Sequence, residues 1–175
     1  MLEAEGKRLE VARKSAVCRL DAVQHWLMKS EPDVYGFTDL WNAPHRTGGW
    51  EGVRNYQARN FIKQMRVGDG VLFYHSACKT PGVAGVASVV REAYPDTVQF
   101  NPDSAYFDPK SPFEQPRWMQ VDIQAVRPLT LVRLEMLRAD PLLTGLLILR
   151  RGNRLSVTPV SEAHYQRVLE LGAAS

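Results

Sequence analysis

The strongest constraint on the fold of this chain is an alternation of apolar and polar residues over positions 119–125. Its apolar members are Met119, Val121, Ile123 and Ala125, and its polar members are Gln120, Asp122 and Gln124. Since successive side chains of a β-strand point to opposite faces, this period of two predicts a strand with one buried face. The continuous apolar runs 71–75 and 83–90 predict two more strands, and the first should be buried on both faces.

Short helices are predicted between the strands. Asn55 is a suitable N-cap for a helix whose apolar residues follow the spacing i, i+3, i+4, i+7. Asp33, Thr130 and Ser161 have the side chains of N-caps and precede three other helical segments. The helices are expected to be brief because each apolar stripe is short.

The remaining segments complete the fold prediction. Apolar residues at 25–29 and 155–160 predict further strands, whereas the proline-rich segment 100–116 predicts a long ordered loop. A doubly wound parallel sheet needs regular alternation of strands and helices, which this order lacks. The sequence therefore favours an α+β fold with a small, partly closed barrel and helices around it.

Residues 1–23 differ from the rest of the chain. They contain five basic and four acidic residues, no aromatic residue and only a weak apolar stripe. We expect a flexible or loosely docked N-terminal extension there. One folded domain should follow over residues 24–173, because a chain of 175 residues suits a single core.

Composition leaves several classes of function open. The formal net charge of +3 and the pI of about 9.0 permit nucleic-acid binding without requiring it. Cys18, Cys78 and the four histidines show no metal-ligand spacing or disulfide framework. No run approaches the roughly 18 apolar residues of a membrane span. We expect a monomeric protein in a reducing cytoplasm, or in the nucleus of a eukaryote, with no cofactor, metal or membrane partner.

The segment 50–61 has the composition of a binding site. Trp50 follows two glycines and precedes a Glu-Gly pair, so it is expected on a loop, where aromatic residues commonly bind ligands. A core tryptophan is the ordinary alternative. Stacking of one nucleic-acid base on such a ring contributes about 1–3 kcal/mol. Ser30 and Asn55 supply donors and acceptors for the edge of that base.

Basic residues flank this segment on both sides. Lys29 and Arg54 are suited to contact phosphates. Residues 150–154 place Arg151 and Arg154 around a glycine that allows close approach of a backbone. A charged hairpin turn would have the same sequence, so both interpretations stand.

Polar residues end the buried strand 71–75. Tyr74, His75 and Ser76 are placed to contact a ligand at the mouth of a barrel. Alternatively, His75 and Cys78 could form a nucleophilic pair, since an imidazole can activate a thiol. The sequence shows no third group that would orient such a pair, which makes an enzyme the less favoured interpretation.

Several long segments resemble the EVE domain family, in the same order along the chain. They are residues 26–32, 50–61, 67–76 and 150–159, with shorter matches at 93–96 and 107–111. The resemblance covers residues 25–171 and leaves the N-terminal extension outside. It implies a PUA-like fold, a small mixed barrel of about five to six strands surrounded by short helices.

The resemblance also implies a binding site. Related YTH domains read N6-methyladenine through an aromatic cage, and EVE domains are associated with modified bases in DNA or RNA. By this resemblance Trp50 stacks on the base, Ser30 and Asn55 contact its edge, and an opposite lip comes from residues 74–76, 81 and 82. The complete candidate site is Lys29, Ser30, Trp50, Val53, Arg54, Asn55, Tyr74, His75, Ser76, Pro81, Gly82, Arg151, Asn153 and Arg154.

The sequence therefore predicts a non-enzymatic protein that binds nucleic acid through a pocket for a flipped, modified base. Candidate bases are 5-methylcytosine, 5-hydroxymethylcytosine and N6-methyladenine. A PUA-type RNA-binding module and a sensor of nucleobase-like small molecules are the alternatives. Discrimination should be weak, because one methyl group in an apolar pocket contributes only about 0.8 kcal/mol.

Overall fold

The computed structural model describes residues 22–173 of the chain. Its centre is a single six-stranded sheet in the order β2-β5-β4-β3-β1-β6. The strands are β1 (His25–Ser30), β2 (Thr47–Gly49), β3 (Gly70–His75), β4 (Gly82–Pro95), β5 (Met119–Arg133) and β6 (Val157–Val160). Of the N-terminal extension predicted over residues 1–23, nearly all lies outside the described residues.

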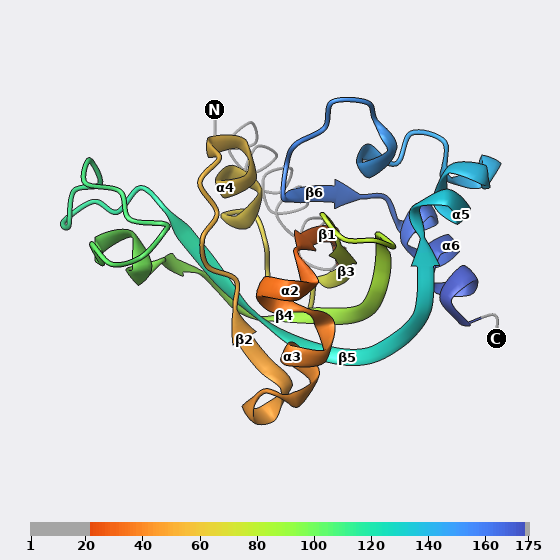
Figure 1. Ribbon diagram of the computed structural model, residues 1–175, viewed down its shortest axis with the longest axis horizontal. Coiled ribbons are helices and arrows are strands. Elements are labelled where there is room, and N and C mark those ends of the chain that lie inside the picture. The colour runs from red at the N-terminus through yellow and green to blue at the C-terminus, as the bar shows by residue number, and fades with distance from the viewer. Residues whose placement is uncertain (1–21, 174–175) are drawn as a thin grey trace, which may run out of the picture.

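The sheet is strongly curved because its two longest strands, β4 and β5, bend together (Figure 1). They pair antiparallel with several register shifts, which increase local bending and twist. Strand β1 pairs parallel with β3 and antiparallel with β6. Strands β2 and β6 form the two ends of the sheet, so it is barrel-like but open. The predicted α+β class with a mixed, barrel-like sheet is confirmed.

Short helices connect the strands. The α-helices are α2 (Pro32–Tyr35), α3 (Phe37–Asn42), α4 (Tyr56–Ile62), α5 (Leu134–Ala139) and α6 (Glu162–Ala173). Single 3-10 turns are η1 (Pro44–Arg46), η2 (Thr97–Phe100), η3 (Pro141–Leu143) and η4 (Leu147–Leu149). No helix within residues 22–173 is long and apolar enough to cross a membrane.

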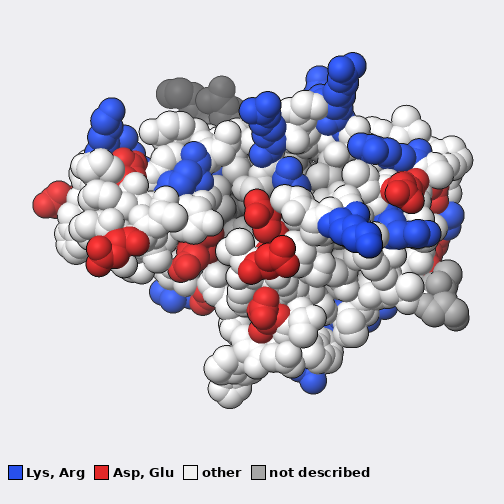
Figure 2. All heavy atoms as spheres, in the orientation of Figure 1, with Lys and Arg blue, Asp and Glu red and all other residues white. Residues whose placement is uncertain are grey.

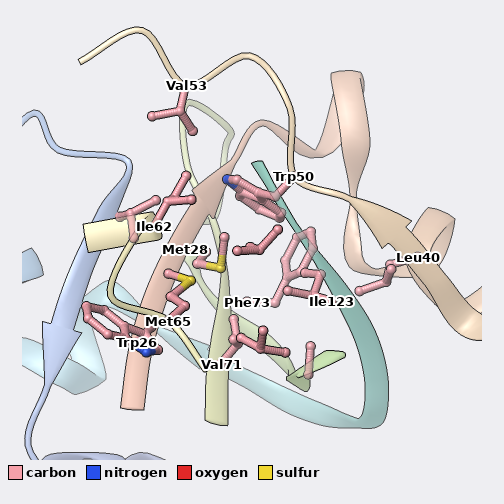
Figure 3. Packing of buried hydrophobic residues seen from close by; sticks show 14 of the residues in the cluster. Trp26, Met28, Leu40, Trp50, Val53, Ile62, Met65, Val71, Phe73 and Ile123 are labelled. Atoms are coloured by element: carbon pink, nitrogen blue, oxygen red, sulfur yellow. The ribbon is translucent and has the colours of Figure 1, made fainter. Parts of the chain in front are cut away.

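Two apolar clusters lie on opposite faces of β3. Val71 and Phe73 belong to the cluster shown in Figure 3, whereas Leu72 and Tyr74 belong to the other. All four are buried, so the prediction of a strand buried on both faces is confirmed. Val121, Ile123 and Ala125 of β5 face the first cluster, as their alternation predicts.

Two predicted helix caps are present. The Oδ1 atom of Asn55 accepts hydrogen bonds from the backbone N–H groups of Gln57 at 2.9 Å and Ala58 at 3.1 Å. The hydroxyl of Ser161 accepts one from the N–H of His164 at 3.2 Å. Each cap satisfies backbone donors that have no partner within their own helix.

Two other cap predictions are wrong. Asp33 lies inside the first turn of α2, whose N-cap position is Glu31. Thr130 lies within β5, which continues to Arg133 before α5 begins. The pairing of Val132 with Val83 of β4 keeps this stretch extended, so long-range pairing overrides the local helix signal.

Candidate nucleic-acid interface

A cavity of about 850 Å3 opens where the end of β1, helix α2 and the segment after β2 meet. We refer to it as the main cavity. Its lining comes from residues far apart in the sequence: Lys29, Ser30, Glu31, Val34, Tyr35, Gly49, Trp50, Glu51, Gly52, Val53, Ser76, Tyr94, Tyr106, Gln120, Arg154 and Ser156. Aromatic rings, hydroxyls and both signs of charge therefore surround one space.

Trp50 forms the inner wall of the main cavity. Its backbone N–H donates to the carbonyl of Val121 at 2.8 Å, which continues the pairing of β2 with β5. Its ring meets that of Phe73 edge to face at 5.3 Å between centroids, and only 6% of the residue is exposed (Figure 3). Trp50 is thus both a core residue and part of the lining, and its orientation is fixed by packing.

Tyr106 contributes a more exposed ring over the segment 50–54, which we call the rim segment. It is 41% exposed and packs on Gly52, whose φ of +80° is left-handed. A Cβ added to Gly52 would lie 2.8 Å from the ring. Glycine is therefore required both by the backbone conformation and by the close approach of the ring.

A buried carboxylate joins the rim segment to the long loop 96–118. The Oδ2 atom of Asp96 accepts hydrogen bonds from the N–H of Gly52 at 2.9 Å and from Nη1 of Arg54 at 2.8 Å. The Nε atom of Arg54 donates to the carbonyl of Tyr106 at 2.8 Å. Such charge-assisted bonds are stronger than neutral ones, so they set the distance between the two segments.

The long loop 96–118 is itself held together by a buried amide. Nε2 of Gln99 donates to the carbonyls of Asp96 and Trp118 at 2.6 and 3.0 Å. Its Oε1 accepts from the hydroxyl of Ser111 and the N–H of Trp118 at 2.6 and 3.1 Å. The indole N–H of Trp118 donates to Asp108 at 2.8 Å and, as the largest cause, lowers the pKa of that carboxyl. The predicted long ordered loop is confirmed.

Tyr94 and Gln120 line one side of the main cavity, and Asp122 lies beside them outside the lining. The hydroxyl of Tyr94 donates to Oδ1 of Asp122 at 2.5 Å. Burial, followed by this hydrogen bond, raises the pKa of Tyr94 to about 12. Arg91 stacks on the Tyr94 ring at 3.6 Å. Tyr94 therefore keeps its proton at neutral pH and directs it to Asp122.

Strand β1 ends in Lys29 and Ser30, which lie beside Ser76 at the main cavity. The backbone N–H of Lys29 donates to the carbonyl of Ser156 at 2.8 Å, and that of Ser76 to the carbonyl of Ser30 at 2.9 Å. The hydroxyl of Ser76 also donates to the carbonyl of Ser30, at 3.4 Å. All three residues, Lys29, Ser30 and Ser76, line the main cavity. Partial burial lowers the pKa of Lys29, because the charged ammonium is disfavoured away from water.

A second, smaller depression of about 380 Å3 lies beside residues 150–154, which we call the arginine turn. Arg150, Arg151 and Arg154 are exposed there and form no ion pair with any described residue. Arg154 lines both depressions. Figure 2 shows Lys and Arg side chains along the upper edge of this face, where Figure 1 shows α4 and the segment before β6.

The comparisons with known proteins agree with this architecture. The EVE domain family model matches residues 24–171. The chain belongs to the EVE domain family.

Individual relatives show how similar this EVE domain is to others. It is 39% identical to human thymocyte nuclear protein 1 over 171 residues, 88% of this chain and 76% of that protein. Among solved structures it matches human THYN1 protein in complex with DNA containing 5-methylcytosine, with a TM-score of 0.81 and 39% identity. That match covers 87% of this chain and 99% of the other.

A more distant structure shares the fold alone. It is the YTH domain of the Zygosaccharomyces rouxii MRB1 protein in complex with N6-methyladenosine RNA, at 12% identity and a TM-score of 0.51. The match covers 89% of this chain and 87% of the other. The predicted likeness of the fold to YTH domains is confirmed.

The EVE domain brings together only part of the candidate site. Of the predicted site residues, those that line the main cavity are Lys29, Ser30, Trp50, Val53, Ser76 and Arg154. Arg151, Asn153 and Arg154 line the second depression. Asn153 also shapes the arginine turn, because its Nδ2 donates to the carbonyl of Leu147 at 2.7 Å and its Oδ1 accepts from the N–H of Leu155 at 3.0 Å.

Two predicted contacts have other partners in this EVE domain. Arg54 was expected to meet a phosphate, but Asp96 and the carbonyl of Tyr106 hold its guanidinium, and its Nη2 is buried. Asn55 was expected at the edge of a base, but its side-chain oxygen caps α4. Each side chain satisfies nearby polar groups of the fold, which competes with a role toward a ligand.

The predicted opposite lip also lies elsewhere, apart from Ser76. Tyr74 is buried in the second apolar cluster, and Gly82 pairs closely with Val132 and Arg133 of β5. Pro81 accepts a hydrogen bond from the N–H of Leu134 through its carbonyl. None of the three residues lines the main cavity.

His75 has a structural partner. Its Nε2 accepts a hydrogen bond from the backbone N–H of Phe37 at 3.0 Å, at the start of α3. Burial lowers the pKa of His75, although nearby Asp39 acts in the opposite direction. The neutral imidazole is therefore occupied as an acceptor, while Cys78 is a half-buried free thiol. Among residues 22–173, no group of three or more His, Cys, Asp and Glu side chains could hold a metal ion.

Sequence reasoning missed the aromatic and amide residues contributed by distant segments. Tyr94 lies near the end of β4, Tyr106 in the long loop, and Gln120 near the start of β5. Gln120 is only 6% exposed, although the alternation in β5 placed it on the polar face. Tyr94 falls inside one of the short segments typical of the family, which is the one signal that could have found it.

Proposed function

We propose that this EVE domain binds nucleic acid without catalysis and holds one extruded, modified base in the main cavity. The observation that carries the proposal is that Trp50 and Tyr106, from two segments joined by Asp96, both line a cavity that also contains Lys29 and Arg154. The cavity volume of about 850 Å3 falls within the range typical of small-molecule sites.

The chemistry of the lining suits a planar ring. Aromatic side chains stack on any base, while hydroxyl and amide groups can bond to its edge. The complex of human THYN1 protein with DNA containing 5-methylcytosine supports a modified base in DNA as the ligand. The finer choice among 5-methylcytosine, 5-hydroxymethylcytosine and N6-methyladenine belongs to this proposal.

The exposed arginines supply a path for the strand that carries the base. Arg154 lies at the edge of both depressions, so the phosphates beside an extruded base would meet Arg154 and then Arg151. Contacts of this kind position the strand without reading its sequence. They also offset the few kcal/mol needed to unstack a base from a duplex.

The hydrogen bond from the backbone N–H of Phe37 to Nε2 of His75 supports a non-enzymatic role. His75 is the residue that would act as a general base for Cys78, and its acceptor nitrogen already has this partner. We propose that the protein acts as a monomer in the compartment that holds its nucleic acid, the nucleus in a eukaryote. Free base and structured RNA serve as competitors in the test below, since both alternatives would use the same cavity.

The test is titration of labelled duplexes that differ only in one 5-methylcytosine. We expect tighter binding of the modified duplex, and loss of affinity by about tenfold in Tyr106→Ala, since stacking contributes about 1–3 kcal/mol. Tyr106 is 41% exposed, so this variant should fold, and its backbone carbonyl still accepts from Arg54.

Phe113→Ala is the matched control, because Phe113 is an exposed aromatic of the same loop outside both depressions. Equal affinity for both duplexes would contradict the proposal, as would unchanged binding by Tyr106→Ala. Displacement by free base or by unmodified structured RNA, with no preference for modified DNA, would favour the alternatives.

A further inference from the structure

Gln120 is the most unusual polar residue of the main cavity. It is 6% exposed, and its side chain forms no hydrogen bond with any residue in the described part of the chain. A buried amide normally has partners, because an unpaired one costs about 1–3 kcal/mol. The oxygen and nitrogen of its amide still reach solvent, because neither is among the fully buried atoms that lack a partner. The residue lines the main cavity. The amide is therefore available to a ligand.

Gly49 leaves open the space in front of this amide. A Cβ added there would lie 2.8 Å from Oε1 of Gln120, 3.3 Å from the hydroxyl of Tyr94 and 3.4 Å from Oδ1 of Asp122. The three polar groups thus converge on one point of the cavity lining. Any larger residue than glycine at this position would occupy the point where they meet.

The group is rich in acceptors. The hydroxyl of Tyr94 gives its proton to Asp122, so its oxygen can only accept from a ligand. The carboxylate of Asp122 accepts as well, whereas the amide of Gln120 offers one acceptor and two donors. A ligand atom that donates N–H would be satisfied here, and a carbonyl oxygen facing these acceptors would not.

We propose that Gln120 determines specificity by bonding the exocyclic amine of the extruded base, together with its neighbouring ring nitrogen. The main cavity then takes an amino base, with a cytosine or adenine ring, in preference to a keto base such as thymine or uracil. This inference rests on the function proposed above and adds the chemical class of the base. Cytosine and adenine present a donor beside an acceptor, which the two ends of a carboxamide complement. A carboxamide can also turn over to meet a keto base, but the carbonyl of that base would then face the acceptors of Tyr94 and Asp122.

The test compares two bases of nearly identical shape. Thymine equals 5-methylcytosine with the amine replaced by a carbonyl and a proton added to the ring nitrogen. Single-stranded oligothymidines carrying thymine or one 5-methylcytosine at the centre are titrated against the full chain. We expect wild type to prefer 5-methylcytosine by about tenfold, and Gln120→Met to reduce that preference to about twofold or less.

Gln124→Met is the matched control. Gln124 lies on the same strand, is exposed and donates to the carbonyl of His45, outside the main cavity. It should keep the wild-type preference. Gly49→Ala provides a second variant that leaves Gln120 in place but fills the space before it, and it should also weaken binding of 5-methylcytosine.

The outcomes separate the two proposals. A preference for 5-methylcytosine over thymine that survives in both Gln120→Met and Gly49→Ala would overturn the inference about Gln120 alone. Equal binding of the two oligonucleotides by wild type would do the same. Wild type that binds neither these oligonucleotides nor the modified duplex would overturn the proposed function, and this inference with it.

Discussion

The carboxylate of Asp96 and the guanidinium of Arg54 lie 2.8 Å apart, and the Asp96 side chain has no exposed surface. The two residues are 42 positions apart in the sequence. Their ion pair joins the rim segment to the long loop, and so it connects the inner wall at Trp50 with the outer ring of Tyr106.

Replacing Asp96 with alanine should destabilise the protein strongly. The change leaves a largely buried arginine and the N–H of Gly52 without their acceptor, and removing one partner of a buried pair costs about 3 kcal/mol. Urea denaturation measures this loss. Asp103→Ala, an exposed acid of the same loop, should change the free energy of unfolding by less than about 0.5 kcal/mol. Similar stability of the two variants would contradict the role given to Asp96.

Substitutions of Trp50 should separate packing from binding. Trp50→Ala should lower the free energy of unfolding by about 3–5 kcal/mol, because the ring fills part of the core against Phe73. Trp50→Phe should retain more of that packing and part of the stacking surface. Thermal unfolding and oligonucleotide titration of both variants provide the measurement. An alanine variant as stable as wild type would show that the ring is dispensable for the core.

The imidazole of His75 should make stability depend on pH. Burial lowers its pKa in the folded protein below the ordinary 6.5, so at mildly acidic pH the unfolded chain binds a proton that the folded chain does not. The free energy of unfolding should therefore fall as the pH drops below about 6.5, and level off below the folded-state pKa.

His75→Gln provides the comparison for this pH dependence. Its Oε1 can accept from the N–H of Phe37 as Nε2 of His75 does, but it does not titrate. Urea denaturation at about pH 7.5 and about pH 5 should show a smaller fall for the variant than for wild type, the other histidines being common to both. An equal fall would assign the effect to other groups.

Arg151 should contribute to the salt dependence of binding. If it contacts one phosphate, Arg151→Gln should reduce the slope of log affinity against log salt concentration by about 1 and weaken binding to all sequences alike. Arg46→Gln serves as control, because Arg46 stacks on Trp41 at 3.8 Å and lines neither depression. An unchanged slope for Arg151→Gln would remove it from the path of the strand.

Apolar patterning predicted the strands well, β3 from its continuous apolar run and β5 from its alternation over residues 119–125. The helix-cap prediction failed at Thr130, where pairing with β4 keeps the chain extended. The cavity was harder to predict, because Tyr94, Tyr106 and Gln120 reach it only through the curvature of the sheet and the fold of the long loop. Arg54 and Asn55 have side chains suited to a ligand, but each has a partner within the fold. Arg54 bonds the buried carboxylate of Asp96, and Asn55 accepts from backbone N–H groups at the start of α4.

The ends of the long loop meet at a narrow neck, where the N–H of Asp96 donates to the carbonyl of Trp118 at 3.0 Å. The chain between these two residues therefore leaves and re-enters the sheet at one place. It contains Tyr106, which lines the main cavity. A stretch of different length or sequence could be exchanged there while the sheet stays unaltered. Because both ends of the loop are fixed at the neck, exchange of the loop would alter the outer wall of the main cavity without altering the sheet. Related domains with one scaffold could in this way bind different bases.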